Sequence, residues 1–216
     1  MKISFIGYGS MAEALASKWV GKHSLFIGGR NLDKAEKLAS QLGSDVKFGT
    51  ESEAATFGEI VVLATPHGAV FDAIDAAGGS DALTGKILLD INNPVDTSDF
   101  LPKNYEGVSL AEAIALAAPK SHVVKAFNMC QAKVWKMQPP VFDDRRLVVM
   151  YCGDNDEAKA KIAVLIEDVG CEPQDVGELK YARMLESTAA LVIKFLFSGR
   201  DSLTVLNLIQ PEVKEI

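Results

Sequence analysis

The sequence predicts an α/β protein built on a doubly wound parallel sheet, and three observations support this prediction. Short apolar runs alternate with helical stretches as far as residue 128. Most of these runs stop at glycine, proline or asparagine, as strands joined by crossover helices do. The first run, residues 3–6, leads directly into two glycines and a helical stretch. Such a strand–turn–helix start is typical of a Rossmann-type domain.

The turn after the first run reads Gly-Tyr-Gly-Ser-Met-Ala, the G-x-G-x-x-A form of the dinucleotide-binding fingerprint. Gly7 would permit the sharp turn, Gly9 would let the backbone approach a pyrophosphate, and Ala12 would let helix and strand pack closely. The free amides at the helix N-terminus would bind the phosphates. The alternative is an ordinary strand–turn–helix joint that uses glycine. We expect the dinucleotide to contact Gly7, Tyr8, Gly9, Ser10 and Met11.

The next elements follow the same pattern. We expect strands at residues 3–6, 25–27, 46–48, 60–64, 87–91 and 122–127, and helices at 10–19, 33–42, 51–57, 69–77 and 110–118. The first helix repeats Met11, Leu15 and Trp19 on one face. The run 60–64 is apolar throughout, as a parallel strand buried on both faces is. Residues 95–106 are polar and are predicted to form a loop.

The pattern changes after Gln138-Pro139-Pro140. Strands are predicted at residues 147–152 and 172–176, and helices at 156–168 and 178–198. We therefore expect an NADP-binding Rossmann domain, residues 1–140, and a small C-terminal α/β lobe, residues 141–216, that closes over the site. The last helix is unusually apolar from Leu191 to Phe197, which predicts a homodimer interface. The alternative is that this stretch packs inside its own lobe.

Ligands of such sheets bind in the crevice beyond the carboxyl ends of the strands. The turns that follow the predicted strands should therefore meet around one crevice. Besides the glycine turn, we expect the cofactor to contact Gly29, Arg30, Lys34, Ala64, Thr65, Pro66, His67, Asn93, Pro94, Ala126 and Asn128.

The end of the second strand indicates which cofactor binds. In a site for NAD, an acidic residue there accepts a hydrogen bond from the ribose 2′-hydroxyl. Here the position holds Gly28-Gly29, and the next side chain is Arg30, with Lys34 one helical turn later. Two cations suit the 2′-phosphate of NADP(H), which is the predicted cofactor. The alternative is that both belong to a solvated helix face and pair with Asp33 or Glu36.

The sequence contains little of the usual catalytic chemistry. It lacks G-x-S-x-G and H-E-x-x-H motifs, and its three cysteines lack metal-ligand spacing, so we expect reduced thiols and no metal. His67 is the candidate for proton transfer because it follows the fourth strand, and the alternative is that it only lines the pocket. The catalytic residues are otherwise unknown. Hydride transfer between two redox cofactors needs orientation and exclusion of water more than an acid or base.

Composition and charge argue against several other classes of protein. The net charge of −7 is unlike that of a nucleic-acid-binding surface. The sequence contains no apolar stretch long enough to span a membrane, and no secretory signal is evident at its N-terminus. We therefore expect a cytoplasmic protein whose partner is a small-molecule redox ligand.

Five segments carry a resemblance to known families: residues 27–36, 89–94, 123–128, 152–159 and 182–186. They are similar to segments of the coenzyme F420-dependent NADP oxidoreductases and of the cytosolic reductase domain of the STEAP metalloreductases. The resemblance implies an NADP(H)-binding fold in which a second redox ligand, F420 or a flavin, stacks against the nicotinamide between the lobes. The chain departs from the family at Gly29, where serine is frequent, and at residues 127–129. Its glycine turn is closer to that of the pyrroline-5-carboxylate reductases.

Three functions remain open. The first, which we favour, is hydride transfer between NADP(H) and a deazaflavin (F420) or flavin. The second is an imine reductase of the pyrroline-5-carboxylate reductase type, which the glycine turn favours and the strands predicted in the second lobe do not. The third is a non-catalytic NADPH-binding sensor, which the scarcity of acid–base residues favours.

Overall fold

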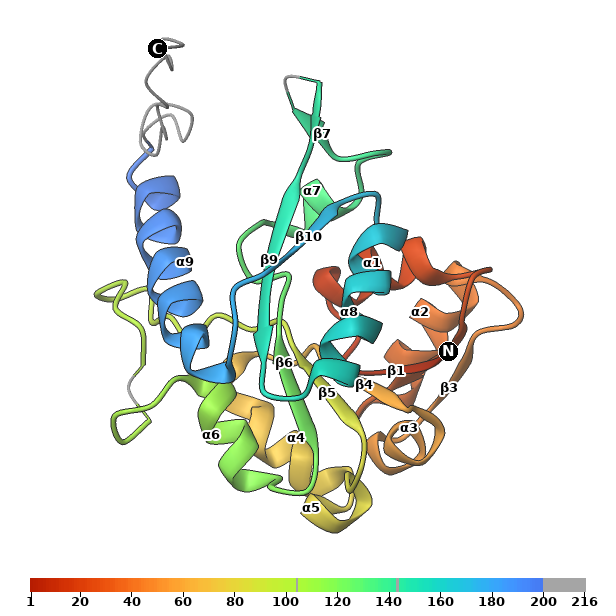
Figure 1. Cartoon of the computed structure of the whole chain (residues 1–216). Coiled ribbons are helices and arrows are strands. Elements are labelled where there is room, and N and C mark those ends of the chain that lie inside the picture. The colour runs from red at the N-terminus through yellow and green to blue at the C-terminus, as the bar shows by residue number, and fades with distance from the viewer. Residues whose placement is uncertain (104, 143, 200–216) are drawn as a thin grey trace, which may run out of the picture.

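The computed structural model describes residues 1–103, 105–142 and 144–199 of the chain. Within these ranges, eight strands form one sheet in the order β10-β9-β6-β5-β4-β1-β2-β3 (Figure 1). The strands are β1 Lys2–Ile6, β2 Ser24–Gly28, β3 Lys47–Gly49, β4 Ile60–Leu63, β5 Ile87–Asp90, β6 His122–Lys125, β9 Val148–Gly153 and β10 Glu172–Asp175. All neighbouring strands are parallel except β6 and β9, which are antiparallel. The fold is a Rossmann-type sheet, as predicted.

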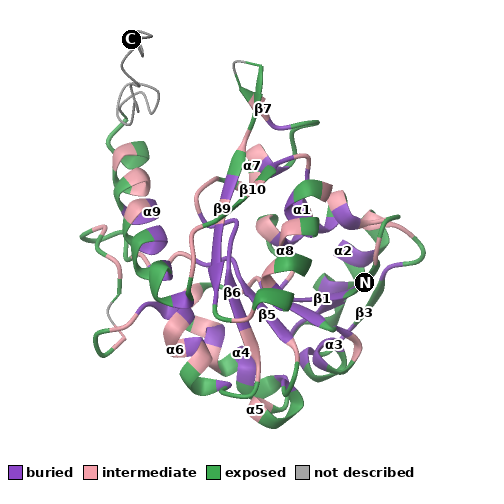
Figure 2. Cartoon of the chain, in the orientation of Figure 1, coloured by how far each residue is buried: buried purple, intermediate pink, exposed green. Residues whose placement is uncertain are grey.

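Helices cover both faces of this sheet. The longer ones are α1 Ser10–Trp19, α2 Leu32–Leu42, α3 Glu51–Phe57, α4 Val70–Ala76, α6 Leu110–Ala117, α8 Asp156–Asp168 and α9 Ala182–Phe197. One core lies between the sheet and α1, α2 and α8, and the other lies between the sheet and α3, α4, α6 and the start of α9. Figure 2 shows the resulting arrangement, with buried strands in the centre and exposed helix faces outside.

The strands alternate their side chains between these two cores. In β4, Ile60 and Val62 join the core of α1, α2 and α8, whereas Val61 and Leu63 join the other core. Because both faces are covered, all residues of β4 are apolar and buried. This explains why the apolar runs of the sequence are continuous rather than alternating.

Trp19, at the end of α1, contacts β1, the segment after β6, and α8. Its ring stacks on Phe5 of β1 with centroids 5.7 Å apart, and it meets the edge of Phe127 at 5.9 Å. Its indole nitrogen donates a hydrogen bond of 3.0 Å to the carbonyl of Leu165 in α8. The segment after β6, which carries Phe127, is therefore fixed against α1 and α8.

The predicted strands and helices before residue 128 are present, with ends shifted by at most two residues. The structure adds α5 Gly79–Ala82, α7 Ala132–Trp135 and a hairpin of β7 Val141–Phe142 and β8 Arg145–Arg146, which are too short to produce a periodic pattern. The predicted helix 178–198 is wrong at its start. A 3-10 turn, Leu179–Tyr181, precedes α9, and the backbone N–H of Leu179 donates to Asp154 at 2.8 Å.

The strands predicted after residue 140 extend the same sheet. β9 pairs with β6, and β10 pairs with β9. α9 contacts α6 and β9 through its first turns, and its second half projects beyond the sheet (Figure 1). Throughout the described ranges, each helix is too short or too polar to traverse a lipid bilayer.

Candidate functional site

The crevice at the carboxyl ends of the strands holds two adjoining cavities. The first has a volume of about 320 Å³ and the second about 360 Å³. Four residues line both cavities and form their common wall: Gly9, Ala64, Thr65 and Pro66. An elongated ligand can therefore pass from one cavity to the other over the glycine turn.

The glycine turn has the geometry that the fingerprint predicts. Gly7 has a φ of 122°, and a Cβ at this position would lie 2.3 Å from the carbonyl oxygen of Ala64. Around Gly9 no atom of the described residues lies within 4 Å of a would-be Cβ, which leaves the backbone open to a ligand. In the same part of the chain, no side chain caps the N-terminus of α1. The first-turn amides of α1 thus have the environment of a phosphate-binding helix N-terminus.

Arg30 and a buried carboxylate line the first cavity. Arg30 is exposed and, among the described residues, forms no ion pair. Lys34 is exposed on the next turn, but it does not line the cavity. Glu51 is only 8% exposed and lines the cavity from the start of α3. The sequence analysis missed Glu51, although its position directly after a short strand could have indicated it.

Tyr8 explains the glycine that precedes Arg30. A Cβ at residue 29 would lie 2.5 Å from Cε1 of the Tyr8 ring, so the ring occupies the space that a side chain there would need. Tyr8, Gly29 and Arg30 all line the first cavity. The resemblance leads one to expect serine at position 29. The Tyr8 ring occupies the space that this serine side chain would need.

The second cavity contains buried polar atoms that lack a protein partner. Thr65 Oγ1, His67 Nδ1 and Asn128 Oδ1 are buried and form no hydrogen bond with any described residue, and all three residues line this cavity. Buried polar atoms are nearly always paired, so a cluster of unpaired ones indicates a missing ligand. A nicotinamide carries a carboxamide with both donors and an acceptor, and this set of atoms fits it.

The second cavity also contains residues that the sequence analysis did not select. Its full lining is Gly9, Ser10, Met11, Ala64, Thr65, Pro66, His67, Ile91, Asn92, Asn93, Phe127, Asn128 and Cys130. Three expected residues line neither cavity: Lys34, which is exposed on α2, Pro94 and Ala126. Ala126 is buried in a core, and Pro94 is buried with its carbonyl accepting a hydrogen bond from the Lys103 backbone. Their positions after strands predicted the correct edge of the sheet but not the direction of the side chains.

A buried ionic cluster adjoins the second cavity through Asn92, which lines that cavity and bonds to the cluster. Lys125 Nζ donates to Asp90 at 2.8 Å, to Glu186 of α9 at 3.0 Å and to the carbonyl of Asn92 at 2.6 Å. Lys125 and Asp90 are fully buried. Burial alone would lower the pKa of Lys125, but the two carboxylates outweigh it and raise that pKa. The lysine is therefore charged, and it holds the Asn92 loop at the end of β5.

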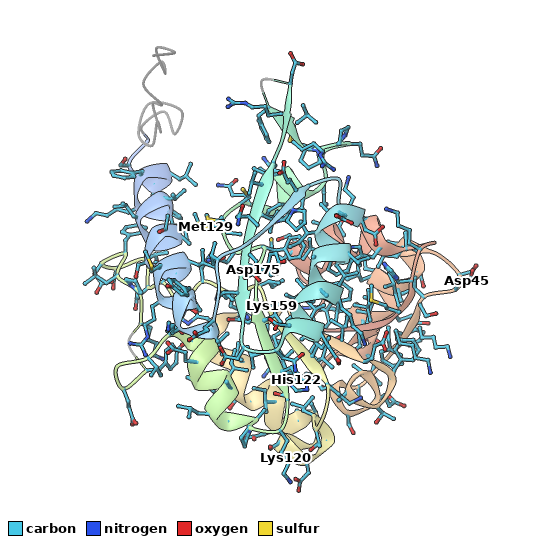
Figure 3. All side chains as sticks on the ribbon, viewed as in Figure 1. Asp45, Lys120, His122, Met129, Lys159 and Asp175 are labelled. Atoms are coloured by element: carbon cyan, nitrogen blue, oxygen red, sulfur yellow. The ribbon has the colours of Figure 1, made fainter. Side chains whose placement is uncertain are left out.

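The other candidate side chains are less suited to catalysis. Burial raises the pKa of the Cys130 thiol, which is therefore protonated at neutral pH. His23 bonds to Asp168 at 2.8 Å, away from the crevice. Figure 3 shows His122 and Met129 well apart along β6, and because His122 is the first residue of that strand it lies at the amino end of the sheet, opposite the edge that carries the cavities. His67 is the histidine that lines the site.

Comparisons with known proteins agree with this geometry. Residues 2–94 match the sequence family described as NADP oxidoreductase, coenzyme F420-dependent. The metalloreductase STEAP3 of Rattus norvegicus is 33% identical over 187 residues, which is 86% of this chain and 36% of that protein. The human metalloreductase STEAP2 is 28% identical over the same length. The chain thus spans about a third of the length of these curated relatives.

The structural comparison covers nearly the whole chain. A solved structure of a proposed F420-dependent NADP-reductase from Arthrobacter sp. FB24 has a TM-score of 0.78 and 30% identity, over 92% of this chain and 94% of that one. An imine reductase from Aspergillus terreus, solved with NADPH4, has a TM-score of 0.66 over 92% of this chain and 63% of its own. At 18% identity, the second likeness shows a shared fold only.

Proposed function

The chain belongs to the family of coenzyme F420-dependent NADP oxidoreductases, and on this premise we propose that it transfers a hydride between NADP(H) and a deazaflavin such as F420, or a flavin. The observation that carries the proposal is the second cavity, with its unpaired polar atoms beside the glycine turn. These atoms can orient a nicotinamide. The remaining lining includes Met11, Ala64 and Pro66, which are apolar and accessible to a second ring.

Each part of the crevice has a role in this proposal. The N-terminus of α1 would hold the pyrophosphate, and Arg30 at the cavity wall would hold the 2′-phosphate, with Lys34 one helical turn outside the cavity as a second cation. Thr65 and Asn128 would orient the nicotinamide. When bound, the two cofactors supply the hydride donor and the hydride acceptor. The chain itself contributes orientation and the exclusion of water, which suffice for a transfer between two rings.

The scarcity of titratable groups supports direct hydride transfer. Among the described residues, His67 and Cys130 are the titratable side chains that line the second cavity, and the Cys130 thiol is protonated at neutral pH. Within the described ranges, neither forms a hydrogen bond or an ion pair with a carboxylate, and Asp96 interacts with His67 only through space. We therefore predict that His67→Ala retains most of its turnover with a flavin-type acceptor, whereas loss of an essential general acid costs about a hundredfold or more.

Two other functions keep some support. The Gly-Tyr-Gly-Ser-Met-Ala turn, which is closer to that of the pyrroline-5-carboxylate reductases, favours reduction of a C=N bond. A non-catalytic NADPH sensor would also explain the missing acid–base groups. We rank both below hydride exchange with a flavin-type ring, because the matched family and the Arthrobacter structure are both described as F420-dependent.

Stopped-flow mixing distinguishes these functions. The protein is mixed with NADPH and F420, FMN or FAD, and separately with NADPH and pyrroline-5-carboxylate, while NADPH oxidation is followed by absorbance. We expect oxidation with at least one flavin-type acceptor, by wild type and by His67→Ala. Oxidation with the imine alone would favour the imine reductase, and none with any acceptor would favour the sensor. Abolished turnover of His67→Ala with every flavin would overturn the mechanism.

A further inference from the structure

We infer that Asn128 fixes the orientation of the nicotinamide carboxamide by accepting a hydrogen bond from its N–H, through a side-chain oxygen that can act only as an acceptor. This inference rests on the proposed function in one respect, because it requires the nicotinamide of NADP(H) to occupy the second cavity. It does not depend on which acceptor takes the hydride.

Among the described residues, the side-chain amide of Asn128 has one polar atom that is hydrogen-bonded and one that is not. Asn128 is 3% exposed and lines the second cavity, and its Oδ1 has no hydrogen-bond partner among the described residues. Its Nδ2 is fully engaged, since it donates to Asn93 Oδ1 at 3.0 Å and to the carbonyl of Leu185 at 3.1 Å. The Oδ1 atom is therefore the part of the amide left for a ligand.

The surroundings forbid the opposite orientation of the amide. Leu185 contributes a backbone carbonyl, which can only accept, so the NH₂ group of Asn128 must face it. The side chain of Asn93 is fixed as well, because its Nδ2 donates to the backbone carbonyl of Asn128 at 2.6 Å. A flipped Asn128 would place its oxygen against the oxygen of Leu185. The second cavity thus offers an acceptor, and not a donor, at this position.

The two groups that hold the Asn128 amide are themselves anchored by the buried ionic cluster. Leu185 precedes Glu186, which accepts hydrogen bonds from the amides of Leu110 and Ala111 at 3.0 and 3.2 Å and from Lys125 at 3.0 Å. Lys125 also bonds to the carbonyl of Asn92, the neighbour of Asn93. One buried lysine therefore positions both the α9 carbonyl and the asparagine loop that orient Asn128.

The residue before Asn128 is held in a strained conformation that is consistent with this role. Phe127 has a φ of 59°, in the left-handed region that a bulky residue rarely adopts. Its buried ring meets Trp19 and Trp135 edge-on, with centroids 5.9 and 5.4 Å apart. Strain of this kind persists only where the surrounding structure enforces it, and it is frequent at binding sites. The packed ring thus fixes the backbone that directs Asn128.

The chemistry of a carboxamide matches this arrangement. Its NH₂ group donates and its carbonyl accepts. Asn128 Oδ1 would accept from the NH₂ group, and Thr65 Oγ1, which is also buried and unpaired, can donate to the carbonyl. Exchange of the two carboxamide groups would bring two oxygens together. The pair therefore selects one orientation of the carboxamide and holds it at this wall of the second cavity.

Binding of cofactor analogues tests this inference without turnover. In 3-acetylpyridine adenine dinucleotide phosphate a methyl group replaces the carboxamide NH₂, whereas the thionicotinamide analogue keeps that NH₂ group. Calorimetric titration of the wild-type protein should show the acetylpyridine analogue binding roughly tenfold more weakly than NADP⁺. The thionicotinamide analogue should bind nearly as well as NADP⁺. Equal affinity of wild type for NADP⁺ and the acetylpyridine analogue would overturn the inference.

Two variants complete the test. Asn128→Ala should bind NADP⁺ and the acetylpyridine analogue equally, because the acceptor is gone. Arg30→Ala is the matched control, which should weaken both ligands alike and keep their ratio. Adenosine 2′,5′-bisphosphate, which lacks the nicotinamide, should bind wild type and Asn128→Ala equally. If Asn128→Ala no longer binds adenosine 2′,5′-bisphosphate, the substitution has disturbed the whole site. The inference is then judged by the ratio of the wild-type affinities for NADP⁺ and the acetylpyridine analogue. If the protein reduces no flavin, the proposed hydride acceptor is wrong. The expected ratio of affinities for NADP⁺ and the acetylpyridine analogue stays the same.

Discussion

At the scale of single residues, Arg30 carries the preference of the first cavity for a 2′-phosphate. It lies exposed at the cavity wall and, within the described part of the chain, has no carboxylate partner that a phosphate would have to displace. A lost charge-assisted phosphate contact costs about 1.5–3 kcal/mol, so Arg30→Ala should weaken NADPH binding roughly tenfold or more. NADH binding should barely change. A fluorescence titration with both cofactors measures this, and equal losses for both would contradict the NADP assignment. Lys37→Ala, an exposed cation further along α2, is the control and should affect neither cofactor.

Single residues also show how far the site could be predicted. The turns after the strands were predicted correctly because the topology of a parallel sheet brings all carboxyl ends to one edge, whatever the side chains are. The directions of those side chains were not predictable, so Ala126 was expected in the site and is buried in a core. The partners of Lys125 lie 35 and 61 residues away in sequence, and no local pattern reveals them.

At the scale of elements, α9 presents an apolar side that the other described residues leave exposed. Leu185 and Ala189 are buried against the body, whereas Met184 and Leu191, which are seven residues apart and so share one side of the helix, are 63% and 45% exposed. We therefore predict a homodimer through this side of α9. Light scattering at micromolar concentration should give twice the mass of the chain, and Leu191→Asp should return it to the monomer. A monomeric mass for wild type would rule the dimer out.

The elements themselves were predicted well where the burial pattern is strong and poorly where a single contact decides. β4 is buried on both faces, and its apolar run gave the correct strand. The start of α9 depends on a hydrogen bond between the Leu179 backbone and Asp154, which are 25 residues apart. Helical periodicity continues through that point, so the sequence predicted one uninterrupted helix.

At the scale of the whole molecule, the buried ionic cluster joins β5, β6, α6 and α9. Lys125→Met would leave Asp90 and Glu186 buried without their cation, and breaking a buried pair in this way costs roughly 3–5 kcal/mol. We predict a loss of that size in the free energy of unfolding, measured with urea at pH 7. Lys120→Met is the control, because its ion pair with Asp81 is exposed, and it should change stability by less than about 1 kcal/mol. Equal effects of the two substitutions would contradict the prediction.

The contact between α6 and α9 contains two carboxylates with opposite pH responses. Partial burial pushes the pKa of Glu112 up, but hydrogen bonds from Arg183 and Ser109 outweigh it and lower the pKa to about 2. For Glu186 burial dominates, and the pKa is raised in spite of Lys125. Glu112 stabilises the fold at pH values above the pKa that it has in the unfolded chain. The contribution of Glu186 is present at low pH and is lost as the pH rises through its pKa in the folded protein. The pH profile of the wild-type protein therefore mixes both responses.

The difference between wild type and Glu112→Gln isolates the first response. Arg183 donates two hydrogen bonds of 2.7 Å to Glu112, and because Arg183 is half exposed we expect the substitution to cost only about 1 kcal/mol at pH 7. A carboxylate with a lowered pKa contributes its full stability above pH 4.5 and loses it as the pH falls toward 2. In urea unfolding at pH 6, 4 and 3, the difference in the free energy of unfolding should therefore shrink steadily. Glu157→Gln, an exposed carboxylate of α8, should show no such trend. A difference that stays constant from pH 6 to pH 3 would mean that Glu112 does not hold α9 to α6 through its charge.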